Sequence, residues 1–147
     1  MTAAVAPAAD HDPVYLRQDR RGGVAVLTLS RPASRNSLSE GMMAALSGAL
    51  AALASDPGVR AVVLTAEGPA FSAGHDLKEI QAHRPDPDRG RAYFESVLAR
   101  CSALMTAIVR LPQPVIAAVE GMATAAGCQL VASCDLAVAG AGARFCT

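Results

Sequence analysis

The chain has 147 residues, of which 52% are hydrophobic and 18% charged, with equal numbers of basic and acidic residues. This composition predicts one globular domain and excludes an intrinsically disordered chain. Lys and Arg are not concentrated in any run, so the charge distribution does not indicate binding to nucleic acid or to an anionic membrane surface. The sequence has no stretch of 18 apolar residues and therefore predicts no membrane span.

Residues 1–13 are rich in Ala and Pro and are expected to form a disordered N-terminal tail ahead of a single domain over residues 14–147. No basic residue precedes Arg17, whereas secretory and mitochondrial leaders carry early positive charge. We therefore expect a cytoplasmic protein. The four cysteines form no C-x-x-C pair and show no metal-ligand spacing with the three histidines, which predicts free thiols and no metal site.

The first half of the domain predicts a hairpin, a helix and a strand. Residues 14–20 and 24–29 have strand character, and Arg21-Gly22-Gly23 between them supplies a turn. Leu and Met then recur at helical spacing over residues 39–54, with Ser39 as the N-cap. A β-branched run over residues 59–65 predicts a buried strand.

The second half continues with alternating helices and strands. A helix is expected to begin near Asp76, and a long one covers residues 89–109 between proline-rich breaks. Residues 115–119 predict a buried strand and residues 135–139 a further strand, with a short buried helix of small residues over residues 123–133 between them. The order of elements predicts the α/β class.

In two places a strand end leads through small residues into a helix start: residues 62–65 into 73–76, and residues 115–119 into 121–127. Unpaired N–H groups at such helix starts favour negative charge, and two of them aimed at one carbonyl oxygen form an oxyanion hole. Spacing alone leaves open whether the two places converge. The alternative is a pair of ordinary loops with capped helices.

Each notable side chain also has an ordinary interpretation. Asp76 followed by Glu79 resembles a capping box. His75 can be an exposed side chain in a loop, and Cys128 can be a small apolar side chain packed in the interior. Residues 140–145 begin as G-x-G-x-x but end in Phe145, which argues against a dinucleotide-binding fingerprint and a Rossmann or flavodoxin-like domain.

Longer motifs indicate a family. The segments "GPAFSAGHDLKEI", "LPQPVIAAVEG" and "AAGCQLVASCDLAVA", preceded by Arg31-Pro32 and Asn36-Ser37-Leu38, resemble the enoyl-CoA hydratase/isomerase (crotonase) superfamily in the family's own order. The likeness covers residues 14–147 and is greatest to the branch of enoyl-CoA hydratase domain-containing protein 3. It implies a crotonase-like ββα spiral, truncated before the C-terminal helical part that builds trimers.

The resemblance also implies a site for an acyl-CoA. The backbone N–H groups of His75 and Ala126 correspond to the family's oxyanion-hole donors, which bind the thioester oxygen. The residues that correspond to the family's CoA contacts are Ala73, Asp76, Leu77, Arg35 and Ser37. The CoA thioester is the substrate, no separate cofactor is implied, and the full-length form is expected to be a homotrimer or hexamer.

One catalytic position departs from the family. Gln129 stands where the hydratases have their first catalytic Glu, and an amide cannot accept a proton from water as a general base does. The second Glu would follow Thr147. The resemblance therefore implies an acyl-CoA-binding protein of fatty-acid metabolism, a lyase or isomerase by family, with doubtful hydratase activity. The alternatives are isomerase, decarboxylase or thioester hydrolase chemistry, or a regulatory acyl-CoA-binding protein without turnover.

The resemblance covers only the first half of a family chain of about 260 residues. Half a spiral is expected to leave strand edges and apolar helix faces uncovered, which predicts poor stability or aggregation if it is made alone.

Overall fold

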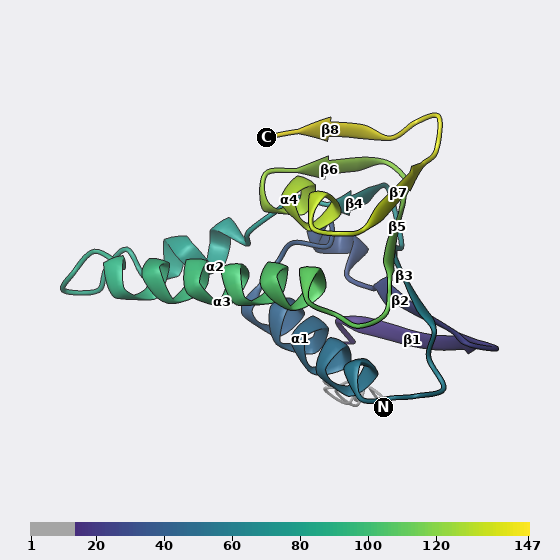
Figure 1. Cartoon of the computed structure of the whole chain (residues 1–147). Helices are drawn as coiled ribbons and strands as arrows, with labels where there is room; N and C mark the ends of the chain where they lie inside the picture. The colour runs from purple at the N-terminus through teal and green to yellow at the C-terminus, as the bar shows by residue number, and fades with distance from the viewer. Residues whose placement is uncertain (1–13) are drawn as a thin grey trace, which may run out of the picture.

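The computed structural model describes residues 14–147, and the tail predicted over residues 1–13 lies outside the described residues. Its larger sheet has the strand order β1-β2-β3-β5-β7 (Figure 1). The predicted hairpin is confirmed, because β1 and β2 pair antiparallel, and all other neighbours in this sheet are parallel. The strands are β1 (Leu16–Arg21), β2 (Val24–Leu29), β3 (Ala61–Ala66), β5 (Val115–Val119) and β7 (Leu136–Ala139).

A second, smaller sheet was not predicted from the sequence. Its parallel strands β4 (Ala70–Ser72), β6 (Met122–Thr124) and β8 (Arg144–Cys146) have the order β4-β6-β8. Three residues are too few to show the alternation that identifies a strand in a sequence. From β3 onward the chain places one strand in the large sheet and the next in the small sheet, which is the expected ββα spiral.

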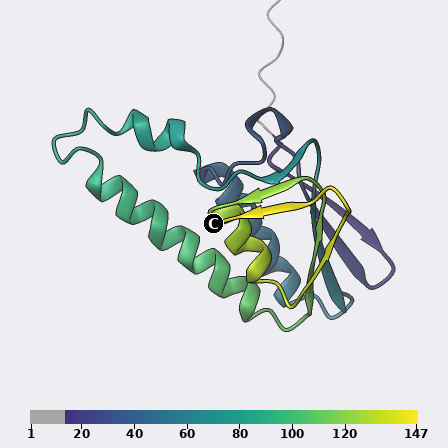
Figure 2. The same ribbon diagram turned by 90° about the horizontal axis from the view of Figure 1, so that it is seen from above.

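Four α-helices accompany the sheets: α1 (Glu40–Ala54), α2 (Leu77–Ala82), α3 (Arg91–Val109) and α4 (Ala126–Ala132). Ser39 caps α1 as predicted, and its side chain accepts a hydrogen bond from the Met42 N–H at 3.2 Å. Helices α1 and α3 pack together, and the core between helices and sheet includes the fully buried Leu46, Phe71 and Leu104. Seen from above, α4 lies beneath the small sheet with α3 alongside (Figure 2).

Helix α3 is long and apolar enough, by length and composition alone, to cross a membrane. One stripe of it carries the buried residues Val97, Cys101, Leu104, Met105 and Ile108, which belong to the core. A stripe at this spacing is the pattern of a helix packed against a protein interior.

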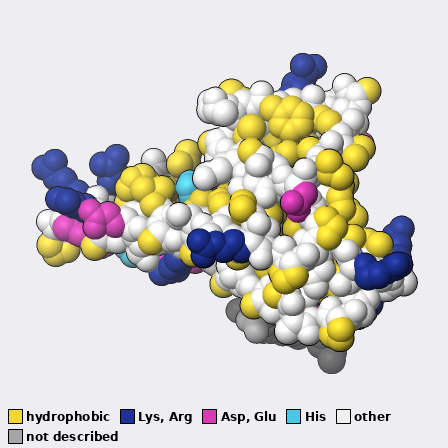
Figure 3. Space-filling view, viewed as in Figure 1, with side chains coloured by type: hydrophobic (Ala, Val, Ile, Leu, Met, Phe, Trp, Pro, Cys, Tyr) yellow, Lys and Arg dark blue, Asp and Glu magenta, His cyan; other side chains and the backbone are white. Residues whose placement is uncertain are grey.

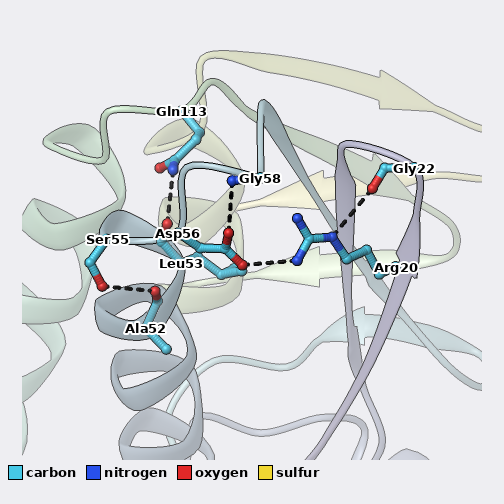
Figure 4. A network of polar contacts seen from close by, with 8 residues as sticks. All are labelled: Arg20, Gly22, Ala52, Leu53, Ser55, Asp56, Gly58 and Gln113. Atoms are coloured by element: carbon cyan, nitrogen blue, oxygen red, sulfur yellow. Dashed lines mark hydrogen bonds and ion pairs between the residues drawn. The ribbon is translucent and has the colours of Figure 1, made fainter.

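The connection from α1 to β3 is held by a network of polar contacts (Figure 4). Asp56 accepts hydrogen bonds from the Gly58 N–H at 2.8 Å and from Arg20 at 2.9 Å. These two donors lower the pKa of the Asp56 carboxyl, the Gly58 N–H more than Arg20. The buried Gln113 lies just before β5, and its side chain donates to the Leu53 carbonyl of α1 at 2.8 Å.

The last part of the spiral exposes apolar side chains. β7 is the outermost strand of the large sheet and is exposed along its whole length, as is β8 in the small sheet. Leu136 and Val138 are 64% and 66% exposed, and Phe145 is 48% exposed. Figure 3 shows hydrophobic side chains gathered over this part of the molecule. The expected uncovered strand edge is present, and the expected exposure of an apolar helix face is seen on α3 at Phe94, Leu98 and Val109.

Candidate functional site

Two loops distant in sequence are joined beside the predicted donor His75. The Leu38 N–H donates to the Gly74 carbonyl at 2.7 Å, and the Ala73 N–H donates to the Arg35 carbonyl at 3.0 Å. Ser72 is fully buried, and its hydroxyl donates to the Asn36 carbonyl at 2.9 Å. These bonds fix the backbone from Ala73 to His75 in one position.

Asn36 holds the first of these loops, a role that the sequence did not indicate beyond its place in a motif. Its amide is fully buried and donates to the carbonyls of Glu67 and Ala70 at 2.8 and 2.9 Å, while its oxygen accepts from the Arg31 N–H at 2.8 Å. Its φ of +50° lies in the left-handed region that asparagine tolerates better than most residues. The sequence shows only an Asn in a polar loop, because two of its three side-chain partners, Glu67 and Ala70, lie more than 30 residues away.

The second predicted place meets the first at Gly74. A Cβ at Gly74 would lie 3.0 Å from the Thr124 carbonyl oxygen and 3.2 Å from the Ala126 nitrogen, and the residue has φ +81°. Gly127 approaches from the other side, and any side chain on it would overlap the Ser72 carbonyl. Both glycines are needed for this close approach, which brings His75, directly after Gly74, next to the start of α4.

The N–H groups at this junction are available. Ala126 is the first residue of α4, so its N–H has no partner within the helix. The neighbouring Ala125 N–H donates instead to the Cys146 carbonyl at 2.9 Å, and the Gln129 N–H to the Ala125 carbonyl at 3.0 Å. Among residues 14–147, no hydrogen bond uses the N–H of His75 or Ala126.

Ala125 has an unusual backbone conformation, with φ +48° and ψ −124°, which no feature of the sequence predicted. A non-glycine residue in such a region costs about 1–3 kcal/mol and persists only where the surroundings impose it. Here it turns the chain sharply from β6 into α4 and aims the first turn of the helix at the Gly74 loop.

Replacing Ala125 by glycine is expected to raise the free energy of unfolding by about 1 kcal/mol, because glycine adopts positive φ without the Cβ penalty. Ala44, exposed within α1, is the matched control, since glycine there is expected to cost about 1 kcal/mol. Urea denaturation of both variants measures the two effects. A loss of stability in Ala125→Gly equal to that in Ala44→Gly would contradict the strained geometry.

An open groove of about 660 Å³ lies beside this junction, and we call it the basic groove because Arg31, Arg35 and Lys78 line it. It is bounded by parts of residues 31–37 and 73–78. All five residues that the resemblance assigned to CoA binding line it: Arg35, Ser37, Ala73, Asp76 and Leu77. The structure therefore brings together two groups of predicted residues that are 36 or more positions apart.

The capping of α2 differs in part from the prediction. Asp76 is the N-cap as expected, accepting from the Lys78 N–H at 2.9 Å, and its second oxygen accepts from the Ser37 hydroxyl at 3.0 Å. Glu79 does not reach back to Asp76 as in a capping box. It accepts from the Glu40 N–H at 2.9 Å and so caps α1, because the spiral places the two helix starts side by side.

The His75 imidazole is half-buried in the wall of the basic groove and is not the exposed loop side chain that its ordinary interpretation gives. Burial lowers the pKa of this imidazole below its usual value of 6.5. Its Nε2 atom is buried without a hydrogen-bond partner among the described residues.

Gln129 lies one helical turn after Ala126, with an exposed side chain. Residues three apart on a helix are neighbours, so Gln129 shares a side of α4 with Ala126. Neither residue lines the basic groove, and the site thus consists of a groove on one side of the junction and α4 on the other.

All four cysteines are free, as predicted. Burial raises the pKa of Cys101, and burial together with the neighbouring Asp135 raises that of Cys134 to about 11, so both thiols stay protonated. Cys128 is partly buried in the first turn of α4. No cluster of three His, Cys, Asp or Glu residues suited to a metal ion is found within residues 14–147.

The spiral fold and this junction define a crotonase-like protein, and residues 19–147 match the enoyl-CoA hydratase/isomerase family. The chain belongs to that family. It is similar to the mitochondrial enoyl-CoA hydratase domain-containing protein 3 of Xenopus laevis, with 44% identity over 93% of this chain and 45% of the relative. It is also 40% identical to the enoyl-CoA hydratase EchA19 of Mycobacterium tuberculosis, over 86% of this chain and 47% of the relative.

Solved structures give the same result. An enoyl-CoA hydratase of Mycobacterium smegmatis superposes with a TM-score of 0.83 and 59% identity, over 90% of this chain and 50% of that one. Human enoyl-CoA hydratase domain-containing protein 3 superposes with a TM-score of 0.83 and 42% identity, over 91% and 51%. The chain thus spans about half the length of the relatives it matches.

The expected cytoplasmic location is wrong by these comparisons, because the domain-containing protein 3 relatives of frog, rat, mouse and human are named as mitochondrial. The expectation rested on missing positive charge in residues 1–13. That absence is weak support, since compartment is set by whole targeting segments and not by single residues.

Proposed function

We propose that this chain binds the thioester of an acyl-CoA and stabilises an enolate-like oxyanion with the N–H groups of His75 and Ala126. The observation that carries the proposal is the close approach of Gly74 to Ala126, which sets two N–H groups that have no acceptor within residues 14–147 beside one groove. Donors of this kind stabilise a developing negative charge, and one such donor is typically worth about 3 kcal/mol of transition-state stabilisation.

The basic groove suits the rest of a CoA molecule. Arg31, Arg35 and Lys78 supply positive charge for phosphates. The acidic side chain among the described lining residues, Asp76, accepts hydrogen bonds from the Ser37 hydroxyl and the Lys78 N–H. Fatty-acid or other acyl-CoA metabolism is the corresponding role, with the CoA thioester as substrate and no further cofactor. We further propose a homotrimer or hexamer for the full-length protein, which its mass in solution measures.

Replacing Gln129 by glutamate tests which chemistry the site supports. A carboxylate at this position supplies a general base, which typically accelerates a reaction 10²–10⁴-fold. We expect the rate of hydration of a short 2-enoyl-CoA to rise at least about tenfold in Gln129→Glu. The rate is measured from the loss of absorbance of the conjugated thioester. Gln129→Met, which lacks a base, is the matched control and is expected to show no gain.

The alternative functions predict another outcome. No gain of hydration together with tight binding of acetyl-CoA would favour isomerase, decarboxylase or hydrolase chemistry, or regulation by acyl-CoA without turnover. Failure of the natural full-length protein to bind any acyl-CoA would contradict the proposal.

A further inference from the structure

The proposed function uses only the backbone of His75, and its side chain has no assigned role. His75 lines the basic groove and is half-buried, and the Nε2 atom of its ring is buried without a hydrogen-bond partner among residues 14–147. A polar atom removed from water without a partner costs free energy that a bound ligand can recover. This makes the ring a candidate ligand contact.

The neighbouring polar side chains already have partners. The Ser37 hydroxyl donates to Asp76 at 3.0 Å, and the other Asp76 oxygen accepts from the Lys78 N–H. The Ser72 hydroxyl donates to the Asn36 carbonyl and accepts from the Gly74 N–H at 3.3 Å. None of these groups forms a hydrogen bond with Nε2 of His75.

The surroundings also decide the charge of the ring. Its burial lowers the pKa, so the ring is neutral at pH 7. The charged groups that line the same groove are Arg31, Arg35, Lys78 and Asp76, and the facing residues 125–127 of the α4 start carry no charge. A neutral imidazole has one nitrogen that accepts a hydrogen bond.

We infer that His75 contacts the acyl-CoA twice: its backbone N–H meets the thioester oxygen, and its Nε2 accepts a hydrogen bond from an amide N–H of the pantetheine arm. This inference rests on the proposed function. The pantetheine arm is the part of the ligand that carries N–H donors close to the thioester, whereas the phosphates carry acceptors that suit the three cations. Because Nε2 is buried in the structure, the inference includes a turn of the ring that brings Nε2 to the ligand.

Calorimetric titration of the natural full-length protein with acetyl-CoA tests the contact, using His75→Phe and His75→Gln, which both keep the backbone N–H. His75→Phe is expected to bind about tenfold more weakly at pH 7.5, because one buried hydrogen bond is lost. His75→Gln, whose amide oxygen accepts a hydrogen bond, is expected to stay within about threefold of the wild type.

The pH profile adds a readout that a structural role would not move. Protonation removes the acceptor, so wild-type affinity is expected to fall relative to His75→Phe as the pH drops below 6.5 towards 5. The ratio of the two affinities cancels the titration of the CoA phosphates. The advantage of the wild type is therefore expected to be smaller at pH 5 than at pH 7.5.

Nuclear magnetic resonance of ¹⁵N-labelled imidazoles in the wild type gives an independent result, with Nε2 of His75 expected to shift on addition of acetyl-CoA. The inference is overturned if His75→Phe binds acetyl-CoA as tightly as the wild type, or if the Nε2 chemical shift does not change when acetyl-CoA binds. Either result leaves the proposed function intact. Absence of binding in the wild type overturns the proposed function, and the inference falls with it.

Discussion

Replacing Asn36 by alanine is expected to lower the free energy of unfolding by about 4 kcal/mol. The substitution removes hydrogen bonds to Glu67, Ala70 and Arg31 at 2.8–2.9 Å and leaves those backbone groups without partners in a buried region. It also places alanine at φ +50°, where asparagine is better tolerated. Chemical denaturation of the full-length protein measures the effect.

Ser34→Ala is the control for this experiment. Ser34 lies in the same loop, but it is only partly buried and its hydroxyl donates one hydrogen bond, to the Arg31 carbonyl at 3.1 Å. It is expected to cost no more than about 1 kcal/mol. Equal effects of the two substitutions would show that Asn36 does not hold the loop.

Replacing Gly74 by alanine is expected to weaken acetyl-CoA binding at least about 100-fold and to lower stability by about 2–3 kcal/mol. The new Cβ meets Thr124, Ala125 and Ala126 at 3.0–3.2 Å, and the residue has φ +81°. The loop and the start of α4 must move apart, which separates the two proposed donors. Calorimetry and denaturation measure the two effects.

Gly48 offers a control with the opposite sign. It lies in the middle of α1, and a Cβ there meets nothing within 4 Å. Gly48→Ala is therefore expected to stabilise the protein by about 1 kcal/mol and to leave acetyl-CoA affinity unchanged. If Gly74→Ala behaved like Gly48→Ala, the close approach between the two loops would not matter for binding.

The regular elements could be predicted because their residues carry local signals. The β-branched run at residues 115–119 gave the bounds of β5, and the helical spacing after Ser39 gave α1 to within a residue. The small sheet could not be predicted in this way. Its three-residue strands are set by pairing along the spiral, which a local pattern does not record.

In the candidate site, too, features with a local sequence signal could be predicted, and features set by long-range contacts could not. The two turns and the N-cap at Asp76 could be recognised from small residues and spacing, and the family motifs named His75, Ala126 and the CoA contacts. The partner of Glu79 could not be foreseen, because it lies 39 positions away in the chain. The positive φ of Ala125 was equally hidden, since tertiary contacts impose it on a residue that does not favour it.

A crystal structure of the natural full-length protein with acetyl-CoA bound tests directly whether the N–H groups of His75 and Ala126 form an oxyanion hole. We predict that the thioester oxygen lies about 2.7–3.1 Å from the backbone nitrogens of both His75 and Ala126, with CoA in the basic groove. Acetyl-CoA bound with its thioester oxygen away from either nitrogen would contradict this prediction.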